Sequence, residues 1–401
     1  MLISATEAVA RLKVKPATLY AYVSRGLIRS APQGDGRAHG YYAEDVERLR
    51  QKRRGGRRAS APLKAFDAVT PVLDSAVCLI EDGRLYYRGQ DAVALAEHAT
   101  LEQTAALLWT AEPEQVFAAE NLPRLSKRSL RDLPADPAPI ERARAVLGHL
   151  AAEDLGAVDP TPANLLQVGA RLVRALASAV TGALPEAMPV HLQLAQGWKL
   201  DPTGADLLRR ALVLVADHEL NASTYVARCV ASTGATPYAV VLAGLSALSG
   251  PRHGAAASRT EAVLADLSSL RDPGSALADF LRRGERLPGF GHPLYPQGDP
   301  RATAILRALE AGLPRQQLAP MLRIAKSVSR LITQPPNVDF ALGALSVALS
   351  LPRGAALSLF LVGRSVGWIA HAMEQYATGE LIRPRARYVG PLPAPGSDGR
   401  R

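Results

Sequence analysis

The sequence predicts an all-α protein preceded by a small N-terminal unit of short helices and strands. Beyond residue 66, Ala- and Leu-rich runs carry apolar residues at three-to-four spacing, the pattern of helices that bury one face. Residues 1–55 are instead divided by Gly and Pro into short elements. Residues 56–66 mix Arg and Lys with Gly, Ser and Pro and lack apolar periodicity, so we expect a basic linker there.

The expected elements follow from capping and breaker residues. Ser4 or Thr6 can cap the first helix, and Pro16 suits the first turn of the second. Asp82-Gly83, between two half-alternating apolar runs, predicts a hairpin turn. In chain order we expect helices over 5–13 and 16–26, a strand, Gly-rich loop and strand over 27–42, a helix over 43–54, a hairpin over 75–89, and helices over 100–109, 141–153, 163–180 and 204–219. We expect residues 391–401 to be a disordered tail.

Composition predicts a soluble, folded protein of the cytoplasm. Of its 401 residues, 48% are hydrophobic and 21% are charged. No N-terminal stretch has the pattern of a signal peptide and no apolar run reaches about 18 residues, so we expect neither export nor a membrane partner. The two cysteines, Cys78 and Cys229, lack metal-ligand spacing and fit a reducing compartment.

Positive charge is concentrated at the N-terminus. Residues 1–64 contain 14 Lys or Arg and 5 Asp or Glu, a net charge of +9 out of +10 for the chain. Because neutralising phosphates releases counterions from a polyanion, such a segment is typical of nucleic-acid binding when it lies on a suitable fold.

Residues 1–55 resemble the MerR/excisionase type of winged helix-turn-helix domain, because a helix, a short turn and a helix precede a strand pair with a Gly-rich tip. In that motif the second helix enters the major groove and the wing contacts phosphates. The resemblance implies that the residues facing DNA are Lys15, Thr18, Tyr20, Tyr22 and Arg25, with Arg37 on the wing. The alternative is a docking or oligomerising module whose basic charge is only a solvated face.

One loop carries a histidine in an unusual setting. In PGFGHPLYPQGDPR, residues 288–301, His292 follows two glycines and precedes three prolines, so its backbone shape is fixed by its own residues. A rigid loop that holds a histidine is typical of a functional site. The alternative is a long connection in which His292 caps a neighbouring helix.

Ionisable residues also interrupt apolar segments. Asp339 lies at the start of an apolar helix, where desolvation would favour its protonated form and suit a general base. Arg364 lies in a helix that is apolar nearly all round, so an anionic partner is expected. That partner could be a ligand, or Asp339 and Arg364 could form a structural salt bridge with each other or with neighbours.

Two further histidines lie near helix ends, His218 in ADHELNAS and His253 in SGPRHGAAA. With His292 they come from three separated segments. Since HxxxH and HExxH spacings are absent and no cysteine accompanies them, we expect no metal site. No GxGxxG loop after a strand and no GxxxxGK[ST] loop is present, which weakens a nucleotide-binding interpretation.

These segments resemble the citrate synthases. The matching blocks, in the order and spacing of that family, are DGRLYYRGQDAVALAEHATLEQTAALLW, ADHELNASTYVARCVAST, GPRHGAA, PGFGH…GDPR, NVDF and GR…HAMEQ…RP, within about residues 67–390. The resemblance implies an all-helical citrate synthase fold that works at least as a homodimer. It also implies a large domain over 67–253 and 345–390 and a small domain over 254–344.

The resemblance also implies a role for each candidate residue. Asp339 would take a proton from the methyl group of acetyl-CoA, His253 would hydrogen-bond the thioester oxygen, and His292 would polarise the carbonyl of oxaloacetate. The residues that would bind the oxaloacetate carboxylates are His218, Arg301, Arg364 and, from the partner subunit, Arg383. The backbone that would receive the adenine of CoA is that of Leu287, Gly289 and Phe290. Pro296 stands where many relatives have a basic residue, which affects the contacts to the CoA phosphates.

The resemblance implies an enzyme with two substrates, acetyl-CoA and oxaloacetate, and no cofactor. Two alternatives stay open at this point. One is a 2-methylcitrate synthase that uses propionyl-CoA, since one methylene changes binding by only about 1–3 kcal/mol. The other is a transcriptional regulator that uses the synthase body as a metabolite sensor, although a sensor would need the arginines and not the base.

Overall fold

The computed structural model describes residues 2–12, 14, 16–24, 28–32, 39–47, 73–126, 138–285 and 287–391. The chain divides into two units, Met1–Val72 and Leu73–Arg401, each with a core of its own. The predicted linker over 56–66, the second part of the helix predicted over 43–54 and the tail beyond residue 391 lie outside the described residues.

The N-terminal unit contains two helices and a small sheet. Ser4 is the cap of the first helix, because its Oγ accepts a hydrogen bond from the backbone N–H of Glu7 at 3.2 Å. Leu19 and Tyr41 are among the side chains of its core. The elements are β1 (Leu2–Ile3), α1 (Ala5–Leu12), α2 (Pro16–Ser24), β2 (Ser30–Pro32) and β3 (His39–Tyr42), in the antiparallel order β1-β3-β2, and residues 43–47 are helical.

These elements occur in the expected order, except that β1 was not predicted. A two-residue strand carries too little alternation to be recognised in the sequence, and it exists because β3 offers it a partner. The winged helix-turn-helix assignment of this unit stays a prediction.

The second unit is mostly helical and begins with a small antiparallel sheet, β4 (Cys78–Glu81), β5 (Arg84–Tyr87) and β6 (Gln90–Asp91), in that order. The hairpin prediction is confirmed. Asp82 and Gly83 both have positive φ, 51° and 73°, as the tight turn between β4 and β5 requires. β6 is an additional two-residue strand that pairs with β5.

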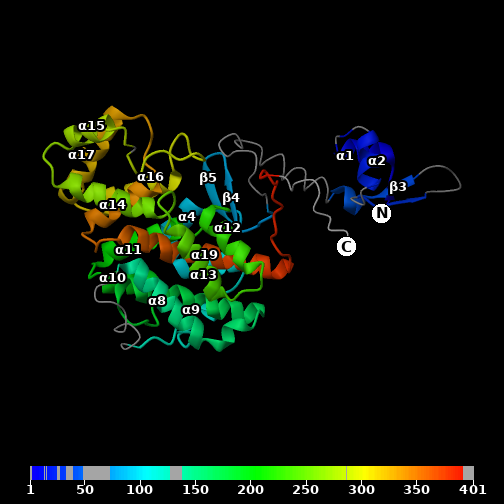
Figure 1. Cartoon of the computed structure of the whole chain (residues 1–401), viewed down its shortest axis with the longest axis horizontal. Coiled ribbons are helices and arrows are strands. Elements are labelled where there is room, and N and C mark those ends of the chain that lie inside the picture. Colours follow the sequence, from blue (N-terminus) through cyan, green and yellow to red (C-terminus); the bar gives the residue numbers. More distant parts are fainter. Residues whose placement is uncertain are drawn as a thin grey trace, which may run out of the picture. The chain divides into compact units, whose positions relative to one another are not determined.

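Helices make up the rest of this unit (Figure 1). They are α4 (Ala92–His98), α5 (Leu101–Trp109), α6 (Pro113–Val116), α8 (Pro139–Glu153), the 3₁₀ turn η2 (Leu155–Val158), α9 (Pro162–Thr181), α10 (Val190–Gly197), α11 (Pro202–Leu214), α12 (Ala222–Ala231), α13 (Pro237–Leu248), α14 (Ala255–Ser268), α15 (Pro273–Arg282), α16 (Pro300–Gly312), α17 (Arg315–Leu331), α18 (Val338–Ala348) and α19 (Ala355–Thr378). The helices predicted over 100–109, 141–153 and 163–180 are therefore confirmed as α5, α8 and α9.

One predicted helix is longer than the observed one. The apolar pattern of 204–219 continues beyond α11, which ends at Leu214. The carbonyl of Val215 accepts a hydrogen bond from Nε of Arg364, and the carbonyl of Ala216 accepts one from the N–H of Gly367. Hydrogen bonds from α19 thus take the place of the next helical hydrogen bonds, and residues 216–221 form a loop.

α19 is the central helix of this unit. It packs against α5, α9, α11, α12, α13, α14 and α18, and all of its first eighteen residues are buried. By length and composition it could cross a membrane, but 94% of its apolar window is buried inside the protein, as in a core helix. α14, α15, α16 and α17 pack together at one end of the unit (Figure 1). The predicted division into a large and a small domain stays a prediction.

Candidate active site

The loop of His292 has the shape that its glycines allow. Gly289 and Gly291 adopt φ values of 86° and 74°, which side-chain-bearing residues rarely do. Nδ1 of His292 accepts a hydrogen bond from the N–H of Leu294 at 3.2 Å, within the same loop. His292 therefore does not cap a helix. Because Nδ1 is an acceptor, the neutral ring carries its proton on Nε2, where it can be donated to a substrate oxygen.

His218 lies beside His292, in the loop between α11 and α12. The two ring centroids are 5.2 Å apart in an edge-to-face arrangement. Nε2 of His218 is 3.0 Å from the hydroxyl of Tyr295, whose ring also contacts His292. Burial, followed by the positive charges of Arg301 and Arg364, lowers the pKa of His218 well below its ordinary value.

His253 occupies the turn between α13 and α14. Its Nε2 is 2.7 Å from Oγ of Ser223 on α12, and Nε1 of Trp368 donates to the same oxygen at 3.2 Å. The single proton of the Ser223 hydroxyl has two acceptors within reach, Oδ1 of Asn221 at 2.9 Å and Nε2 of His253 at 2.7 Å. When it is donated to His253, the imidazole carries its own proton on Nδ1. In that tautomer Nδ1–H of His253 is a donor for a ligand.

His253 and His292 are both neutral at ordinary pH. Burial, together with the charge of Arg364, lowers the pKa of His253 to about 4. Burial and the charge of Arg301 lower the pKa of His292 to about 4 as well. Neutral imidazoles in this environment act as hydrogen-bond donors, because protonation would place another cation near two arginines.

Asp339 is the second residue of α18. Its backbone N–H donates to Oδ1 of Asn337, the cap of the helix, at 3.0 Å. Its carboxylate has no hydrogen bond or ion pair with any described residue. Burial raises the pKa of Asp339 to about 7, although the charge of Arg301 acts in the opposite direction. A carboxyl group with this pKa can accept a proton near neutral pH.

The two candidate arginines are buried and differently partnered. Arg301 forms a bidentate ion pair with Asp299, at 3.0 and 2.8 Å. Oδ2 of Asp299 also accepts a hydrogen bond from the N–H of Val338 at 3.0 Å. Asp299 therefore links Arg301 to the start of α18, the helix that carries Asp339. Nη1 of Arg301 makes no hydrogen bond with a described residue, which leaves it for a ligand.

Arg364 is 1% exposed. Its Nε donates to the carbonyl of Val215 at 2.9 Å, and its Nη2 has no hydrogen-bond partner in the described part of the chain. The alternative of an Asp339–Arg364 salt bridge is wrong, because no ion pair joins these two described residues. A buried guanidinium with an unpaired N–H is costly unless an anion binds it, which favours a ligand.

The structure thus brings six predicted residues together from separate segments. The pKa of His218 responds to Arg301, Arg364, His292 and His253, and that of Asp339 responds to both arginines. Such coupling of perturbed ionisable groups is typical of an active site. The site can bind a small dianion and hold a base and two neutral imidazole donors around it.

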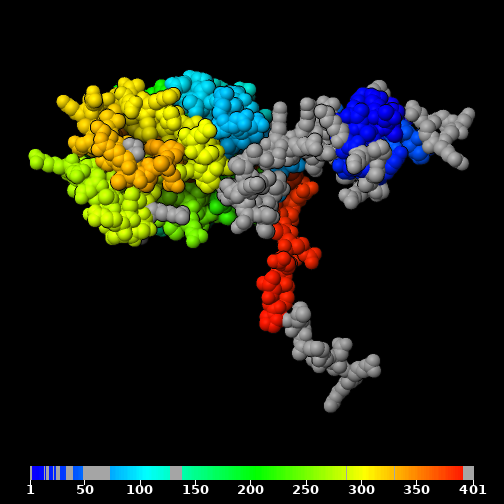
Figure 2. All heavy atoms as spheres, turned by 90° about the horizontal axis from the view of Figure 1, so that it is seen from above, coloured from blue at the N-terminus to red at the C-terminus, as the bar shows by residue number. Residues whose placement is uncertain are grey.

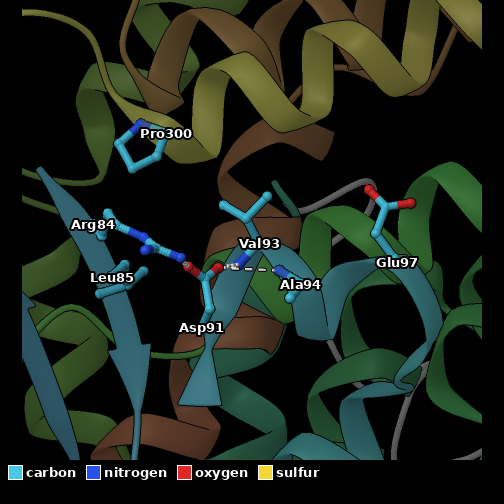
Figure 3. Close-up of a pocket in the computed structure, with 7 residues that line it drawn as sticks. All are labelled: Arg84, Leu85, Asp91, Val93, Ala94, Glu97 and Pro300. Carbon is cyan, nitrogen blue, oxygen red and sulfur yellow. Dashed lines mark hydrogen bonds and ion pairs between the residues drawn. The ribbon is translucent and has the colours of Figure 1, made fainter. Parts of the chain in front are cut away.

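A separate groove of about 400 Å³ lies at the small sheet of this unit (Figure 3). Its ion pair, between Arg84 and Asp91 at 2.5 Å, joins β5 to β6. None of the candidate residues lines it, so we assign the chemistry to the histidine cluster. The residues that line the groove are Arg84, Leu85, Asp91, Val93, Ala94, Glu97 and Pro300.

Known proteins are similar to most of this chain in sequence and in fold. A family model described as "Citrate synthase, C-terminal domain" matches residues 68–385. The chain is 32% identical to a citrate synthase of Mycolicibacterium smegmatis, covering 77% of this chain and 90% of the relative. The chain belongs to the citrate synthase family. It is an enzyme, and its function is that of a citrate synthase.

Two further similarities place the chain within the citrate synthase family. A 2-methylcitrate synthase of Mycobacterium tuberculosis is 31% identical, covering 76% of this chain and 84% of the relative. The crystal structure of a citrate synthase from Thermotoga maritima has a TM-score of 0.69 and 28% identity, and the match covers 82% of this chain and 96% of that one. The citrate synthase fold of the second unit is therefore shown.

The residues predicted to bind CoA lie beside the site. Leu287 is buried, and Phe290 packs against Phe340 of α18 with ring centroids 5.0 Å apart. The carbonyl of Gly289 accepts the N–H of Asn337 at 2.9 Å, which ties this loop to the start of α18.

Arg383 makes no hydrogen bond or ion pair with the candidate site residues of its own chain. It lies in the exposed segment after α19, which Figure 2 shows in red projecting from the body, and it has no polar contact with a described residue. Among the predicted DNA-facing residues, Tyr20 is 57% exposed on α2, and Thr18 and Tyr22 are half-buried. Lys15, Arg25 and Arg37 lie outside the described residues.

Sequence reasoning missed the residues that hold the site in place. Tyr295 lies in the very loop singled out for His292, and Asp299 lies in the same segment beside Arg301. Ser223 is five residues after His218 on the next helix. Their proximity in the chain to candidate histidines and arginines was a usable signal, but nothing in the sequence says which histidine or arginine each would contact.

Proposed function

We propose that Asp339, His253 and His292 condense acetyl-CoA with oxaloacetate. Asp339 removes a proton from the methyl group of acetyl-CoA, while His253 donates a hydrogen bond from Nδ1 to the thioester oxygen as the enol forms. The enol carbon then attacks the carbonyl carbon of oxaloacetate. Nε2–H of His292 donates to that carbonyl oxygen and supplies the proton that the new alkoxide takes up.

The arginines bind the second substrate. Arg364 presents an unpaired N–H and Arg301 its Nη1, so the carboxylates of oxaloacetate complete the hydrogen bonding of both. His218 completes this set beside His292. Water then hydrolyses the citryl thioester to citrate and free CoA. The reaction uses two substrates and no cofactor, and we place the enzyme in the cytoplasm.

The observation that carries this proposal is the carboxylate of Asp339, which has no bonded partner among the described residues and a pKa raised to about 7. A carboxylate with a structural role would be paired with a donor or a cation. A base that deprotonates a weak carbon acid must be unpaired and have a high affinity for the proton. The adenine of CoA is proposed to lie against the backbone of Leu287, Gly289 and Phe290, and with Pro296 in this loop other groups must contact the CoA phosphates.

The acyl preference separates citrate synthesis from 2-methylcitrate synthesis, which the similarity to a 2-methylcitrate synthase keeps as the second candidate. We expect kcat/KM for acetyl-CoA to exceed that for propionyl-CoA when release of free CoA thiol is followed with saturating oxaloacetate. The reverse order would establish the second candidate instead. The base and the arginines would serve both reactions equally.

We further propose that Arg383 completes the site of a partner subunit in a homodimer. A chain end that projects from its own body can cross a two-fold axis. Asp339→Asn and Arg383→Ala should each be nearly inactive. In a mixed dimer one site then carries both changes and the other site carries neither. Because about half of the dimers are mixed after random pairing, joint refolding should restore about a quarter of wild-type activity.

The control for this experiment is a tag pull-down that demonstrates mixed dimers, together with each parent refolded alone. Mixed dimers that are no more active than the parents would show that Arg383 does not act across the subunit interface, and its role as a substrate ligand would be withdrawn.

For the N-terminal unit we propose DNA binding, supported by its basic charge and by the exposed face of α2 at Tyr20. Two copies in a dimer would bind a palindromic site, and the affinity for DNA would fall steeply as the salt concentration rises.

We expect a gel shift with DNA from the chain's own promoter region at low salt, abolished by deletion of residues 1–60. The deletion should leave synthase activity largely intact, since every candidate catalytic residue lies beyond residue 200. No shift at low salt would favour a docking module.

A further inference from the structure

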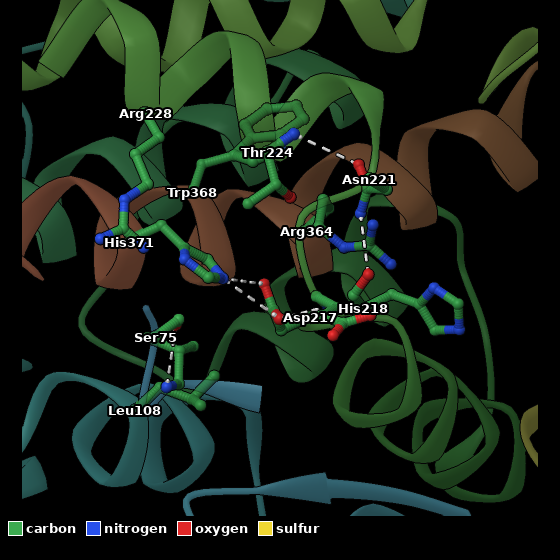
Figure 4. Close-up of polar contacts among 12 residues, drawn as sticks. Ser75, Leu108, Asp217, His218, Asn221, Thr224, Arg228, Arg364, Trp368 and His371 are labelled. Carbon is green, nitrogen blue, oxygen red and sulfur yellow. Dashed lines mark hydrogen bonds and ion pairs between the residues drawn. The ribbon is translucent and has the colours of Figure 1, made fainter. Parts of the chain in front are cut away.

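Asp217 has a buried carboxylate that no step of the proposed reaction uses. It lies next to Arg364 and His218 (Figure 4). Asp217 is 0% exposed and precedes His218 in the chain. Nε2 of His371, on α19, is 3.4 Å from each of its carboxylate oxygens, and Oδ1 also accepts the N–H of Glu219 at 2.9 Å. Figure 4 shows His371 on one side of this carboxylate and Arg364 and His218 on the other.

Two glycines bring α19 against the loop of Asp217. A Cβ at Gly367 would lie 2.2 Å from Oδ2 of Asp217 and 2.5 Å from the carbonyl oxygen of Ala216. A Cβ at Gly363 would lie 2.6 Å from the side chain of Val215. Contacts this close exclude any side chain at either glycine. Gly363, Gly367 and His371 are spaced by four residues, so one face of α19 supports the whole loop.

The negative charge of Asp217 partly compensates the positive charge of Arg364. Burial lowers the pKa of Arg364, and the negative charge of Asp217 is the largest influence that opposes this. Burial raises the pKa of Asp217, but His371 and Arg364 together hold it below its ordinary value. Asp217 and Arg364 form no direct ion pair. The guanidinium is therefore balanced from behind while its Nη2 stays unpaired.

The other side of His371 faces a second carboxylate. Nδ1 of His371 is 3.9 Å from Oε2 of Glu374, one turn further along α19. Glu374 is itself engaged by Arg228 at 3.2 Å and by the hydroxyl of Ser75 at 2.8 Å. Glu374 thus places a second carboxylate beside His371, while Nδ1 of His371 makes no hydrogen bond with a described residue.

We propose that Asp217 and His371 are a positioning pair, which holds Arg364 and His218 in the geometry that binds oxaloacetate. The pair touches no substrate itself. This inference rests on the proposed function, because it names how the same oxaloacetate site is supported. Loss of the pair should weaken oxaloacetate binding and leave the acyl-CoA side of the site unchanged, because Asp339 and His253 are attached to other segments.

Asp217→Asn is the first test, since it removes the charge and keeps the shape. We expect KM and Kd for oxaloacetate to rise about tenfold to hundredfold, the range for a lost hydrogen bond to a charged group, with KM for acetyl-CoA within twofold of wild type. Kinetics by thiol release and titration calorimetry with oxaloacetate alone measure these values. An unchanged oxaloacetate Kd would overturn the proposal. A wild-type chain that does not bind oxaloacetate would instead overturn the proposed function.

His371 supplies the second test, which does not depend on Asp217 variants folding. His371→Leu should raise the oxaloacetate KM about as much as Asp217→Asn, and His371→Gln, which can still donate to Asp217, should restore most of the loss. The matched control is His191→Leu, a buried histidine on α10 whose Nδ1 also lacks a partner among the described residues. It should lower thermal stability and leave the oxaloacetate KM unchanged. Equal losses in His371→Gln and His371→Leu, or the same rise in the control, would overturn the proposal.

A double-mutant cycle with Arg364→Lys separates positioning from general destabilisation. If Asp217 acts through Arg364, Asp217→Asn should change the oxaloacetate Kd much less in the Arg364→Lys background than in the wild type. Effects that multiply independently would show that Asp217 acts elsewhere, and would overturn the assignment.

Discussion

Asp339→Asn should lower kcat by about a thousandfold, within the range expected when a positioned general base is removed. Oxaloacetate affinity should change little, because that substrate is held by the arginines and His218 in the ground state, whereas the carboxylate of Asp339 acts only as the proton moves. Thiol-release kinetics and calorimetry with oxaloacetate measure the two quantities on one preparation.

The pH dependence of this base follows from its raised pKa. The proton acceptor is the ionised form, so kcat/KM for acetyl-CoA should rise as pH increases through about 7 and level off above it. His253 and His292, with pKa values near 4, stay neutral throughout and add no inflection between pH 5 and 8. A profile flat from pH 5 to 9 would contradict the assignment of Asp339.

The same shift makes Asp339 a cost to stability. The folded protein holds this proton up to about pH 7 and the unfolded chain only to about pH 3.8, so stability falls as pH rises between these values. Asp339→Asn should therefore unfold at a higher urea concentration than wild type at pH 8, and at a similar concentration below pH 4. This result doubles as the control that the inactive variant is folded.

Arg364→Leu should raise the oxaloacetate KM by at least about a hundredfold. Its guanidinium is buried and keeps an unpaired N–H for the substrate, so the variant loses charge-assisted hydrogen bonds in a site of low dielectric. Leucine suits the apolar surroundings of α19, and the KM for acetyl-CoA should stay near the wild-type value.

The matched control for this variant is Arg174→Leu on α9. Arg174 is also buried, but its guanidinium donates to the carbonyls of Phe117, Ala118 and Asn121 and faces no candidate residue. It should lower stability without raising the oxaloacetate KM. If Arg364→Leu gave the wild-type KM, or if both variants raised it equally, Arg364 would not be a substrate ligand.

Much of the helical body could be predicted from periodicity, because α5, α8 and α9 bury one continuous face and are bounded by residues that cap or break helices. The end of α11 could not. Its apolar run continues, and the helix stops because Arg364 and Gly367, about 150 residues later, take the carbonyls of Val215 and Ala216. Hydrogen bonds supplied by a distant helix leave no local signal.

The candidate site shows the same division. Asp339 and Arg364 were recognisable as ionisable residues in apolar segments, and the setting of His292 was recognisable from its glycines and prolines. That Asp339 is unpaired and that Asp299 joins Arg301 to α18 could not be predicted from the sequence, because both depend on where the 288–301 loop meets α18. Arg383 and the DNA-facing residues stay predictions, since their partners are other chains.

The most direct test of the account is the product balance of the purified full-length chain. With acetyl-CoA and oxaloacetate, we expect one citrate and one free CoA thiol per oxaloacetate consumed, measured by NMR and by thiol titration, and no thiol release when oxaloacetate is left out. Thiol release that does not require oxaloacetate, or turnover of both substrates without citrate, would contradict the claim that Asp339, His253 and His292 form one condensing site.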